Sequence, residues 1–489
     1  MASLSILHVS DLHRDPKNEV KNKSLLLSLE QDRDRYRMET PRIPDPNLIV
    51  ASGDIIHGVG YGAADAEGEL QRQYDQAADF LAELADRFVS GNRERVVIIP
   101  GNHDVSFYHA HLSMKKIEVD LASDKGLTAA TTMAKRLCAD ANPVRWTWRE
   151  FCFYEVNNRQ MYNRRLEAFC KFYEKFYQGR RSYSLEPEKQ FDIFDYPEHN
   201  VTIVGFSSCH DNDPRNRKGE IHPECFSEAC LHLRQPKYRG RLLLATWHHN
   251  THGGPMQNDY MDSDILQSMI DCGFSIGLHG HQHKTQFIEE KYQFGTEKRM
   301  VVISAGTLCA GPSEFPPGEL RAYNVLELDP ATFSATLHQR RMQNQNYGIV
   351  IWGRGQFALT NSSHVTFKFQ PPPVKNNMVE DNRALGAAEA LMREKKFAEA
   401  VIVLKTIAAN SALAKRMLWD CFVDLEDTKA IVAEFYPPSS PAEIVTMADA
   451  LWEHDRERLR AMLELDAVKT SSDHTVIQVR NIYNARLAI

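Results

Sequence analysis

Five short clusters of acidic, amide and imidazole side chains are spaced along the sequence between residues 11 and 283. They are Asp11-Leu12-His13, Gly53-Asp54, Gly101-Asn102-His103-Asp104, His248-His249 and Gly280-His281-Gln282-His283. Mixed carboxylate, amide and imidazole donors suit divalent ions such as Mn, Fe or Zn, whereas an all-oxygen set suits Mg or Ca and a thiolate set suits structural Zn. The clusters therefore predict a site for divalent metal ions.

The size of the donor set indicates two ions rather than one. About four protein ligands per ion, with one carboxylate shared, account for the whole set. Its members are Asp11, His13, Asp54, Asn102, His248, His281 and His283. Asp11 and His13 alone would also fit the polar end of a strand, but the tetrapeptide Gly101–Asp104 is expected by chance in only about one of several hundred such chains. We therefore predict that the donors converge on one binuclear site.

Each cluster follows a short apolar run, which predicts a buried strand. The runs are Leu4–Val9, Leu48–Ala51, Val96–Ile99, Arg241–Thr246 and Phe274–Leu278. Helical spacing of apolar residues in Ala64–Phe88 predicts a helix between two of these strands, so the chain is predicted to be an α/β protein. Further strands are predicted at Phe191–Phe194 and Val201–Phe206, and alternation from Gln286 to Met342 predicts antiparallel strands. Ligand sites of α/β sheets collect beyond the carboxyl ends of strands, where these clusters lie.

Residues 134–183 form a basic, aromatic segment that we interpret as a helical insertion. Helical spacing of Leu166, Phe169, Tyr173 and Phe176 favours a buried role for most of its aromatic residues. The same composition also fits nucleic-acid binding, because arginine pairs with phosphate and aromatic rings stack on bases.

A proline-rich linker is predicted at 371–380, after which strand-forming residues become rare. The segment 381–489 is predicted to be an all-α domain. Its apolar residues between Leu385 and Leu404 resemble one tetratricopeptide-like helix pair, without a clear second repeat. We expect this domain to bind a protein partner or to self-associate.

Charge, cysteine content and hydropathy indicate the compartment in which the protein is expected. The formal net charge of -7 gives no global basic signal for nucleic acid. The 9 cysteines contain no CxxC pair and fit reduced thiols. The start has no basic signal-peptide region, and no apolar run approaches the roughly 20 residues of a membrane span. We therefore expect a cytoplasmic protein without membrane contact.

In this order, the motifs DLH, GDIIH, GNHD, HH and GHQH resemble those of the calcineurin-like metallophosphoesterase superfamily, over residues 1–345. The resemblance implies that residues 1–370 form a two-sheet sandwich flanked by helices. It also implies how the ions are held: one by Asp11, His13, Asp54 and His283, the other by Asp54, Asn102, His248 and His281. Asp54 would bridge two divalent ions, of which Mn is favoured over Fe, Zn or Ni.

The resemblance also implies a hydrolytic mechanism. A hydroxide bridging two ions, roughly 3.5–4 Å apart, would attack the phosphorus in line with the leaving oxygen. His103 would protonate that oxygen, and Asp104 would orient His103 or raise its pKa. His57 resembles the second active-site histidine of SbcD-type repair nucleases, although an ordinary loop histidine would also fit. Hydrogen bonding to ligands, rather than metal binding, is expected for three flanking histidines: His249, His252 and His279.

Departures from subfamily patterns narrow the expected activity. Ser/Thr protein phosphatases carry GDxxDRG and GNHE, and purple acid phosphatases need a tyrosine ligand that 55–60 does not offer. A phosphodiesterase acting on nucleic acid or nucleotides is predicted, although Asn250 follows the HH pair where proline is common. Two alternatives remain: a cyclic-nucleotide or small-molecule phosphodiesterase, and a scaffold subunit that recruits partners through its helical tail.

Overall fold

Two compact units make up the chain, Met1–Val374 and Lys375–Ile489. The computed structural model describes residues 3–487 except 18–19, 120–122, 138–142, 252–258, 262, 292–298, 312–313, 315–317, 345–349, 358–359, 372–377, 409–411, 439 and 472. Most of the predicted linker 371–380, and also His252, lie outside the described residues.

The first sheet of the larger unit carries three of the predicted strand ends. Its order is β15-β14-β13-β1-β2-β3, with β16 paired to β14. The strands are β1 (Leu4–Val9), β2 (Leu48–Ser52), β3 (Val96–Ile99), β13 (Ala322–Asp329), β14 (Ser334–Met342), β15 (Trp352–Arg354) and β16 (His364–Lys368). β1, β2 and β3 are parallel, since helices connect them, and their carboxyl ends therefore lie at one edge.

The second sheet carries the other two strand ends. Its order is β11-β12-β10-β9-β8-β7. The strands are β7 (Phe191–Tyr196), β8 (Val201–Phe206), β9 (Leu242–Thr246), β10 (Phe274–His279), β11 (Gln286–Lys291) and β12 (Arg299–Ser304). The prediction of antiparallel strands after Gln286 is confirmed for β11, β13 and β14, whereas β12 also pairs in parallel with β10.

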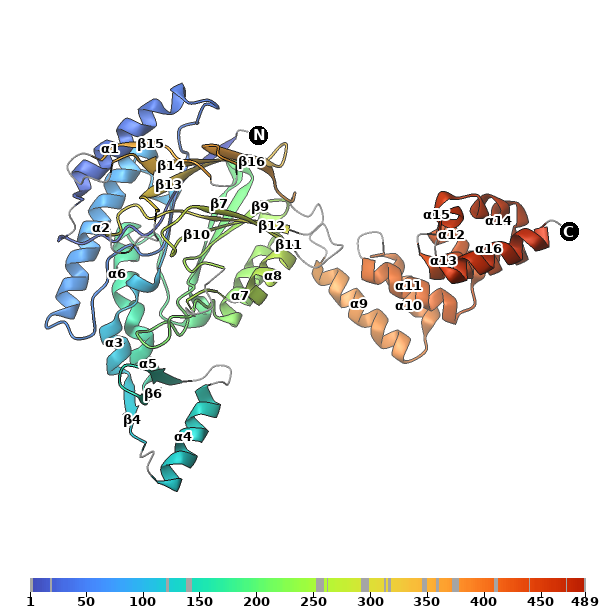
Figure 1. Ribbon diagram of the computed structural model, residues 1–489, viewed down its shortest axis with the longest axis horizontal. Coiled ribbons are helices and arrows are strands. Elements are labelled where there is room, and N and C mark those ends of the chain that lie inside the picture. The colour runs from blue at the N-terminus through green and yellow to red at the C-terminus, as the bar shows by residue number, and fades with distance from the viewer. Residues whose placement is uncertain are drawn as a thin grey trace. The chain divides into compact units, whose positions relative to one another are not determined.

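The two sheets form the expected sandwich, because alternate side chains of the second sheet enter different cores. In β8, Val201 and Ile203 join the core that includes the first sheet, whereas Val204 and Phe206 join a second core with the covering helices. Those helices are α7 (Pro223–Leu233) and α8 (Ser263–Asp271), while α1 (Asn22–Arg35) and α2 (Ala66–Phe88) cover the first sheet (Figure 1). The predicted α/β sandwich with flanking helices is confirmed.

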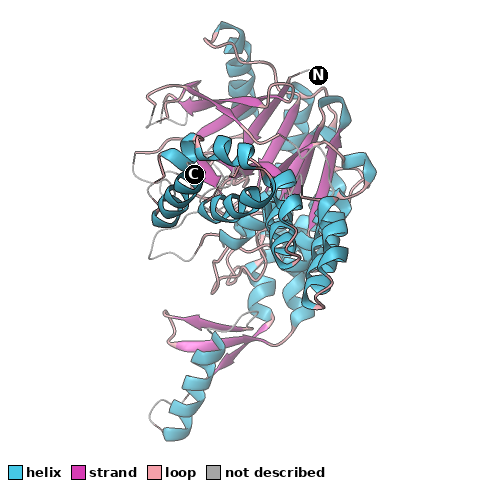
Figure 2. Ribbon diagram, turned by 90° about the vertical axis from the view of Figure 1, so that its right-hand side faces the viewer, coloured by secondary structure: helices cyan, strands magenta, loops and turns pink. Residues whose placement is uncertain are grey.

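The insertion differs from the helical prediction for 134–183, which is wrong for its first half. A three-stranded sheet, β4 (Met114–Ile117), β6 (Cys152–Val156) and β5 (Val144–Thr147), projects with α4 (Asp124–Leu137) as an arm (Figure 2). The β5–β6 hairpin is short, so the basic and aromatic composition of the whole segment concealed its alternation.

The second half of the insertion is helical and belongs to the sandwich. α5 (Arg159–Asn163) is followed by α6 (Glu167–Phe176), which packs against α2. Phe169, Tyr173 and Phe176 are buried in the main core. The aromatic residues of this half therefore stabilise the fold and are not a binding surface.

The smaller unit is helical and has its own core. Its helices are α9 (Met378–Arg393), α10 (Phe397–Lys405), α11 (Ala412–Asp424), α12 (Thr428–Phe435), α13 (Pro441–His454), α14 (Arg456–Leu463), α15 (Asp466–Lys469) and α16 (His474–Leu487). From α9 to α14 each helix packs against the next. Within the described residues of the chain, no helix is both long and apolar enough for a membrane span.

A buried ion pair ties α1 to the first sheet. Asp32 is fully buried and receives two hydrogen bonds from Arg340 of β14, at 2.6 and 2.8 Å. We expect Asp32→Ala to lower the free energy of unfolding by about 3–5 kcal/mol, because it leaves a buried guanidinium with less compensation. Urea unfolding followed by tryptophan fluorescence measures the change. The matched control Asp34→Ala, on the exposed side of α1, should change it by less than about 0.5 kcal/mol.

Candidate metal centre

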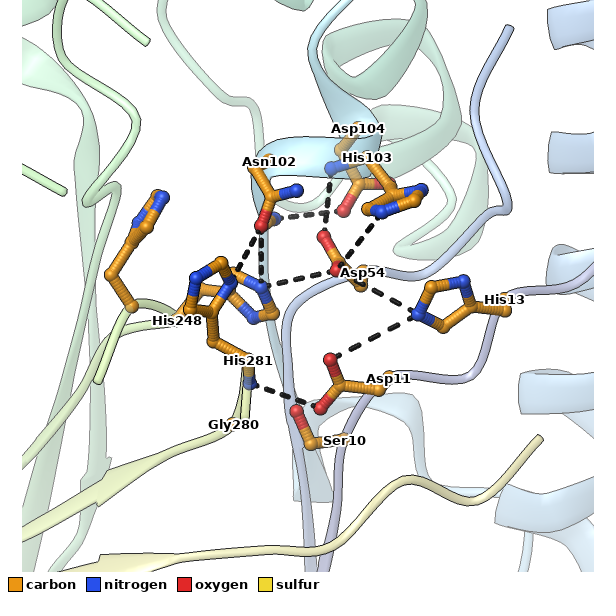
Figure 3. A network of polar contacts seen from close by, with 12 residues as sticks. Ser10, Asp11, His13, Asp54, Asn102, His103, Asp104, His248, Gly280 and His281 are labelled. Carbon is orange, nitrogen blue, oxygen red and sulfur yellow. Dashed lines mark hydrogen bonds and ion pairs between the residues drawn. The ribbon is translucent and has the colours of Figure 1, made fainter. Parts of the chain in front are cut away.

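The clusters predicted from the sequence meet at the carboxyl ends of five strands from both sheets. Ser10 and Asp11 follow β1, Asp54 follows β2, and the 3-10 helix Asn102–Asp104 follows β3 (Figure 3). His248 follows β9, and both His281 and His283 follow β10. The structure brings together all of the predicted metal ligands.

The backbone is specialised at these strand ends. Five ligand residues have left-handed conformations, with φ of 50° at Asp11, 42° at His13, 49° at Asp54, 75° at His281 and 55° at His283. Such non-glycine conformations cost on the order of 1–3 kcal/mol each and cluster at functional sites. Close approach also requires glycine: a Cβ at Gly53 would lie 2.5 Å from His248 Nδ1, and one at Gly101 would overlap the Asp54 carboxylate.

Asp11, His13 and His283 form one side of the site. His283 Nε2 lies 3.2 Å from Asp11 Oδ1, and His13 Nε2 lies 3.9 Å from the same oxygen. Ligand atoms of the three residues lie within 4.8 Å of one another. His13 Nε2 is also 3.7 Å from Asp54 Oδ2, which joins this side to the centre of the site.

Asn102, His248 and His281 form the other side. His248 Nε2 lies 3.2 Å from Asp54 Oδ2 and 3.0 Å from Asn102 Oδ1, and His281 Nδ1 lies 2.9 Å from that amide oxygen. Asp11, Asp54 and His248 form a further group with ligand atoms within 4.8 Å. Asp54 therefore lies between the two sides, as a bridging carboxylate requires.

The electrostatics of the site fit divalent cations. Burial alone would raise the carboxyl pKa values, but His283 holds the pKa of Asp11 below its usual range, and His248 does the same for Asp54. Burial lowers the imidazole pKa, but Asp54 raises that of His248 to about 9, and Asp11 likewise raises that of His283 to about 9. The two buried carboxylates thus stabilise positive charge beside them. Bound metal ions would supply that charge at the same positions.

His103 and His57 lie on the accessible side of the cluster. The His103 backbone N–H donates to Asp54 Oδ1 at 2.8 Å, and its ring Nδ1 contacts the carbonyl oxygen of His57. His103 Nε2 lies 4.0 Å from Asp54 Oδ2. Ring nitrogens of His13, His57 and His103 lie within 4.8 Å of one another, so the two accessible histidines face the same space beside the metal ligands.

Asp104 contacts backbone N–H groups and a tyrosine hydroxyl, and its role toward His103 stays a prediction. Its buried carboxylate accepts hydrogen bonds from the backbone N–H groups of Gly101 at 2.8 Å and Ile55 at 3.1 Å, and from the Tyr74 hydroxyl at 3.0 Å. These bonds fix the loops that carry Asp54 and Asn102, so Asp104 positions the backbone of both loops. Burial raises the pKa of Asp104 to about 7.

Two flanking histidines have supporting contacts. His249 contacts Ser208 Oγ at 2.9 Å and Asn212 Nδ2 at 3.3 Å, and His279 contacts the Gly280 carbonyl at 3.1 Å. Glu314 and Asp259, which were not predicted from the sequence, have carboxylates that lie beside His13 and His281. No motif or periodicity marked these loop residues.

Fold and donor set together define a metal-dependent phosphoesterase. The family model for calcineurin-like phosphoesterases matches residues 4–285, and the chain belongs to that family. The family and the His/Asp clusters define a phosphoester hydrolase with a binuclear divalent-metal site.

Solved structures match the chain at low sequence identity. A dimetal phosphatase from Danio rerio is 12% identical, with 71% of this chain and 98% of that chain covered and a TM-score of 0.36. The calcineurin-like phosphoesterase YfkN from Bacillus subtilis is 13% identical, with 77% and 92% covered and a TM-score of 0.28. A comparison with curated proteins found no match.

The central position of Asp54 gives a direct test of the metal centre. We expect Asp54→Asn to weaken Mn²⁺ binding at both positions by more than about 100-fold, since loss of a mere supporting contact already costs about 10–100-fold. Calorimetric titration of the metal-free protein measures affinity and stoichiometry. Asp34→Asn, on exposed α1 surface, is the matched control. Unchanged binding by Asp54→Asn would contradict the assignment.

Proposed function

We propose that the protein is a manganese-dependent phosphodiesterase that acts on nucleic acid or nucleotides. The observation that carries the hydrolytic part is the placement of two accessible histidines, His103 and His57, beside a buried carboxylate shared by both halves of the ligand set. Bound divalent ions would activate a water and neutralise phosphoryl charge. The protein would then have to protonate the leaving oxygen and orient the substrate.

His103 is suited to protonating the leaving oxygen. Its Nδ1 contacts the His57 carbonyl, which can only accept a hydrogen bond, so this contact favours a proton on Nδ1. Nε2 then remains on the side of the cluster and, when protonated, can transfer its proton to the leaving oxygen. His57, with a side chain that is 49% exposed, would contact a phosphate oxygen, in keeping with its resemblance to repair nucleases.

Two arginines of the insertion, Arg165 and Arg181, give little support for a nucleic-acid substrate. Arg165 is buried and donates to the carbonyls of Tyr162 and Cys209, and Arg181 pairs with Glu94 and Asp192. Both side chains are therefore committed to the fold. Their charge reversal would test stability rather than substrate binding.

Support for the substrate class comes instead from the aromatic tip of the β5–β6 hairpin. Trp148 and Phe151 are 75% and 69% exposed, and their ring centroids are 5.9 Å apart. The Trp146 ring lies 5.6 Å from that of Trp148. Exposed rings of this kind offer faces on which unpaired bases stack, with about 1–3 kcal/mol per base.

The substrate proposal is tested with the double variant Trp148→Ala, Phe151→Ala. In Mn²⁺ we expect KM for a single-stranded oligonucleotide to rise about 10-fold or more, because base stacking is lost. Hydrolysis of a small chromogenic phosphodiester should be unchanged. Steady-state kinetics on single- and double-stranded nucleic acids, cyclic nucleotides and the chromogenic diester provide the measurement.

Three control variants accompany that panel. Met38→Ala removes an equally exposed side chain outside the arm and should change nothing. Asp54→Ala should abolish activity, and His103→Ala should lower kcat by about 10²–10⁴-fold. Preference for cyclic nucleotides, or equal effects of the hairpin variant on all substrates, would contradict the nucleic-acid proposal.

We further propose that residues 381–489 bind a protein partner or a second copy of the chain. The unit has a separate core, and Ile402 and Leu413 are 70% and 55% exposed. Eight cysteines among the described residues are in no disulfide bond, which supports a reducing compartment such as the cytoplasm.

Deletion of residues 380–489 tests the role of the tail. We expect the shortened chain to bind Mn²⁺ with unchanged affinity but to lose self-association or partner capture, because the metal ligands and their cores lie outside the tail. Light scattering and calorimetry measure the two properties. Loss of metal binding with an unchanged assembly state would instead make the tail part of the catalytic fold.

A further inference from the structure

A histidine that binds a metal through one ring nitrogen needs a partner for the other, because that partner fixes the tautomer and the ring orientation. Three different elements supply these partners in the candidate centre. His248 Nδ1 contacts the Ser52 carbonyl at 2.9 Å, and His281 Nε2 lies 3.5 Å from Asp259 Oδ2. Glu314 lies next to the Nδ1 atoms of both His13 and His283.

Glu314 uses different atoms for the two imidazoles. Its backbone carbonyl accepts a hydrogen bond from His283 Nδ1 at 2.8 Å, and its carboxylate Oε2 lies 4.0 Å from His13 Nδ1. In both rings the opposite nitrogen, Nε2, faces Asp11 Oδ1. The residue thus lies on the far side of the two imidazoles from the shared carboxylate oxygen.

The segment before Glu314 is tied to the loop that carries Asp11. Leu308 N–H donates to the Ser10 carbonyl at 3.1 Å, and the Thr307 hydroxyl donates to the Asp11 carbonyl at 2.8 Å. Glu314 Oε2 also accepts the Gly311 N–H at 2.8 Å, which folds the side chain back over its own turn. The Glu314 carboxylate oxygen that faces His13 is thus also hydrogen-bonded to Gly311.

We propose that Glu314 is a positioning residue for one of the two metal ions, the ion held by His13 and His283. Its carboxylate orients His13 and raises the basicity of the metal-facing nitrogen, while its carbonyl orients His283. Asp259 serves His281 on the other side, so each ion has its own supporting acid on a separate loop. The proposal rests on the binuclear centre of the proposed function and is independent of the substrate.

Glu314→Gln isolates the contribution of the carboxylate charge. The substituted side chain can still accept the Gly311 N–H, and the backbone carbonyl behind His283 is retained. In calorimetric titrations of metal-free protein with Mn²⁺, we expect the affinity of one ion to fall about 10–100-fold and that of the other to change by less than about 3-fold. Asp259→Asn is the matched variant and should weaken the complementary ion.

Double variants identify which ion responds. Glu314→Gln should add little to His13→Ala, which already lacks that imidazole, but should retain its full effect in a His281→Ala background. The melting temperature of the metal-free protein should be the same for wild type and Glu314→Gln, whereas a purely structural role would lower it.

Three results would overturn the proposal: equal weakening of both ions, no weakening of either, or an undiminished effect of Glu314→Gln in the His13→Ala background. Failure of the proposed function has a different signature. A wild-type protein that binds two Mn²⁺ ions with these variant effects, yet hydrolyses no phosphodiester, would refute the activity and leave the role of Glu314 intact.

Discussion

Asp11 and Asp54 are buried carboxylates at one edge of the sandwich, and compensation of their charge governs the arrangement around them. An ionised group removed from water costs several kcal/mol unless positive charge or hydrogen bonds replace the solvent. The ion-pair partners of both carboxylates within 4.0 Å, among the described residues, are histidines. Because histidines are also metal ligands, protons and divalent ions can compensate the same carboxylates.

The geometry of the sheets follows from this requirement. Loops after three parallel strands of one sheet and two parallel strands of the other deliver donors to the two carboxylates from several directions, which a single loop could not do. Gly53 and Gly101 allow the loops to approach closely. Asp104 then fixes two of these loops by hydrogen bonding to their backbone, so a third buried carboxylate supports the site without facing it.

Much of this arrangement could be predicted from the sequence, because local and long-range signals agreed. Leu4–Val9, Val96–Ile99 and Val201–Phe206 were predicted with the bounds that the structure gives, as short apolar runs ended by polar residues. The metal-binding side chains at the strand ends could be assigned to one site from the sequence alone, since parallel strands bring their carboxyl ends together. Contacts between distant loops left no such signal. Neither periodicity nor composition indicates how such loops pack. The contacts that were therefore not predicted are those of Glu314 with His13, of Asp259 with His281 and of Arg181 with Glu94.

The left-handed backbone limits which amino acids can replace one another during evolution at five positions: Asp11, His13, Asp54, His281 and His283. Outside glycine, this conformation is best tolerated by Asn, Asp and His, which are also the side chains that bind such metals. The backbone conformation and metal binding therefore favour nearly the same set of amino acids at these positions. A relative that no longer bound metal ions would still tend to keep these amino acids, because its backbone would still need them. Their presence alone would therefore overstate how many relatives are still enzymes.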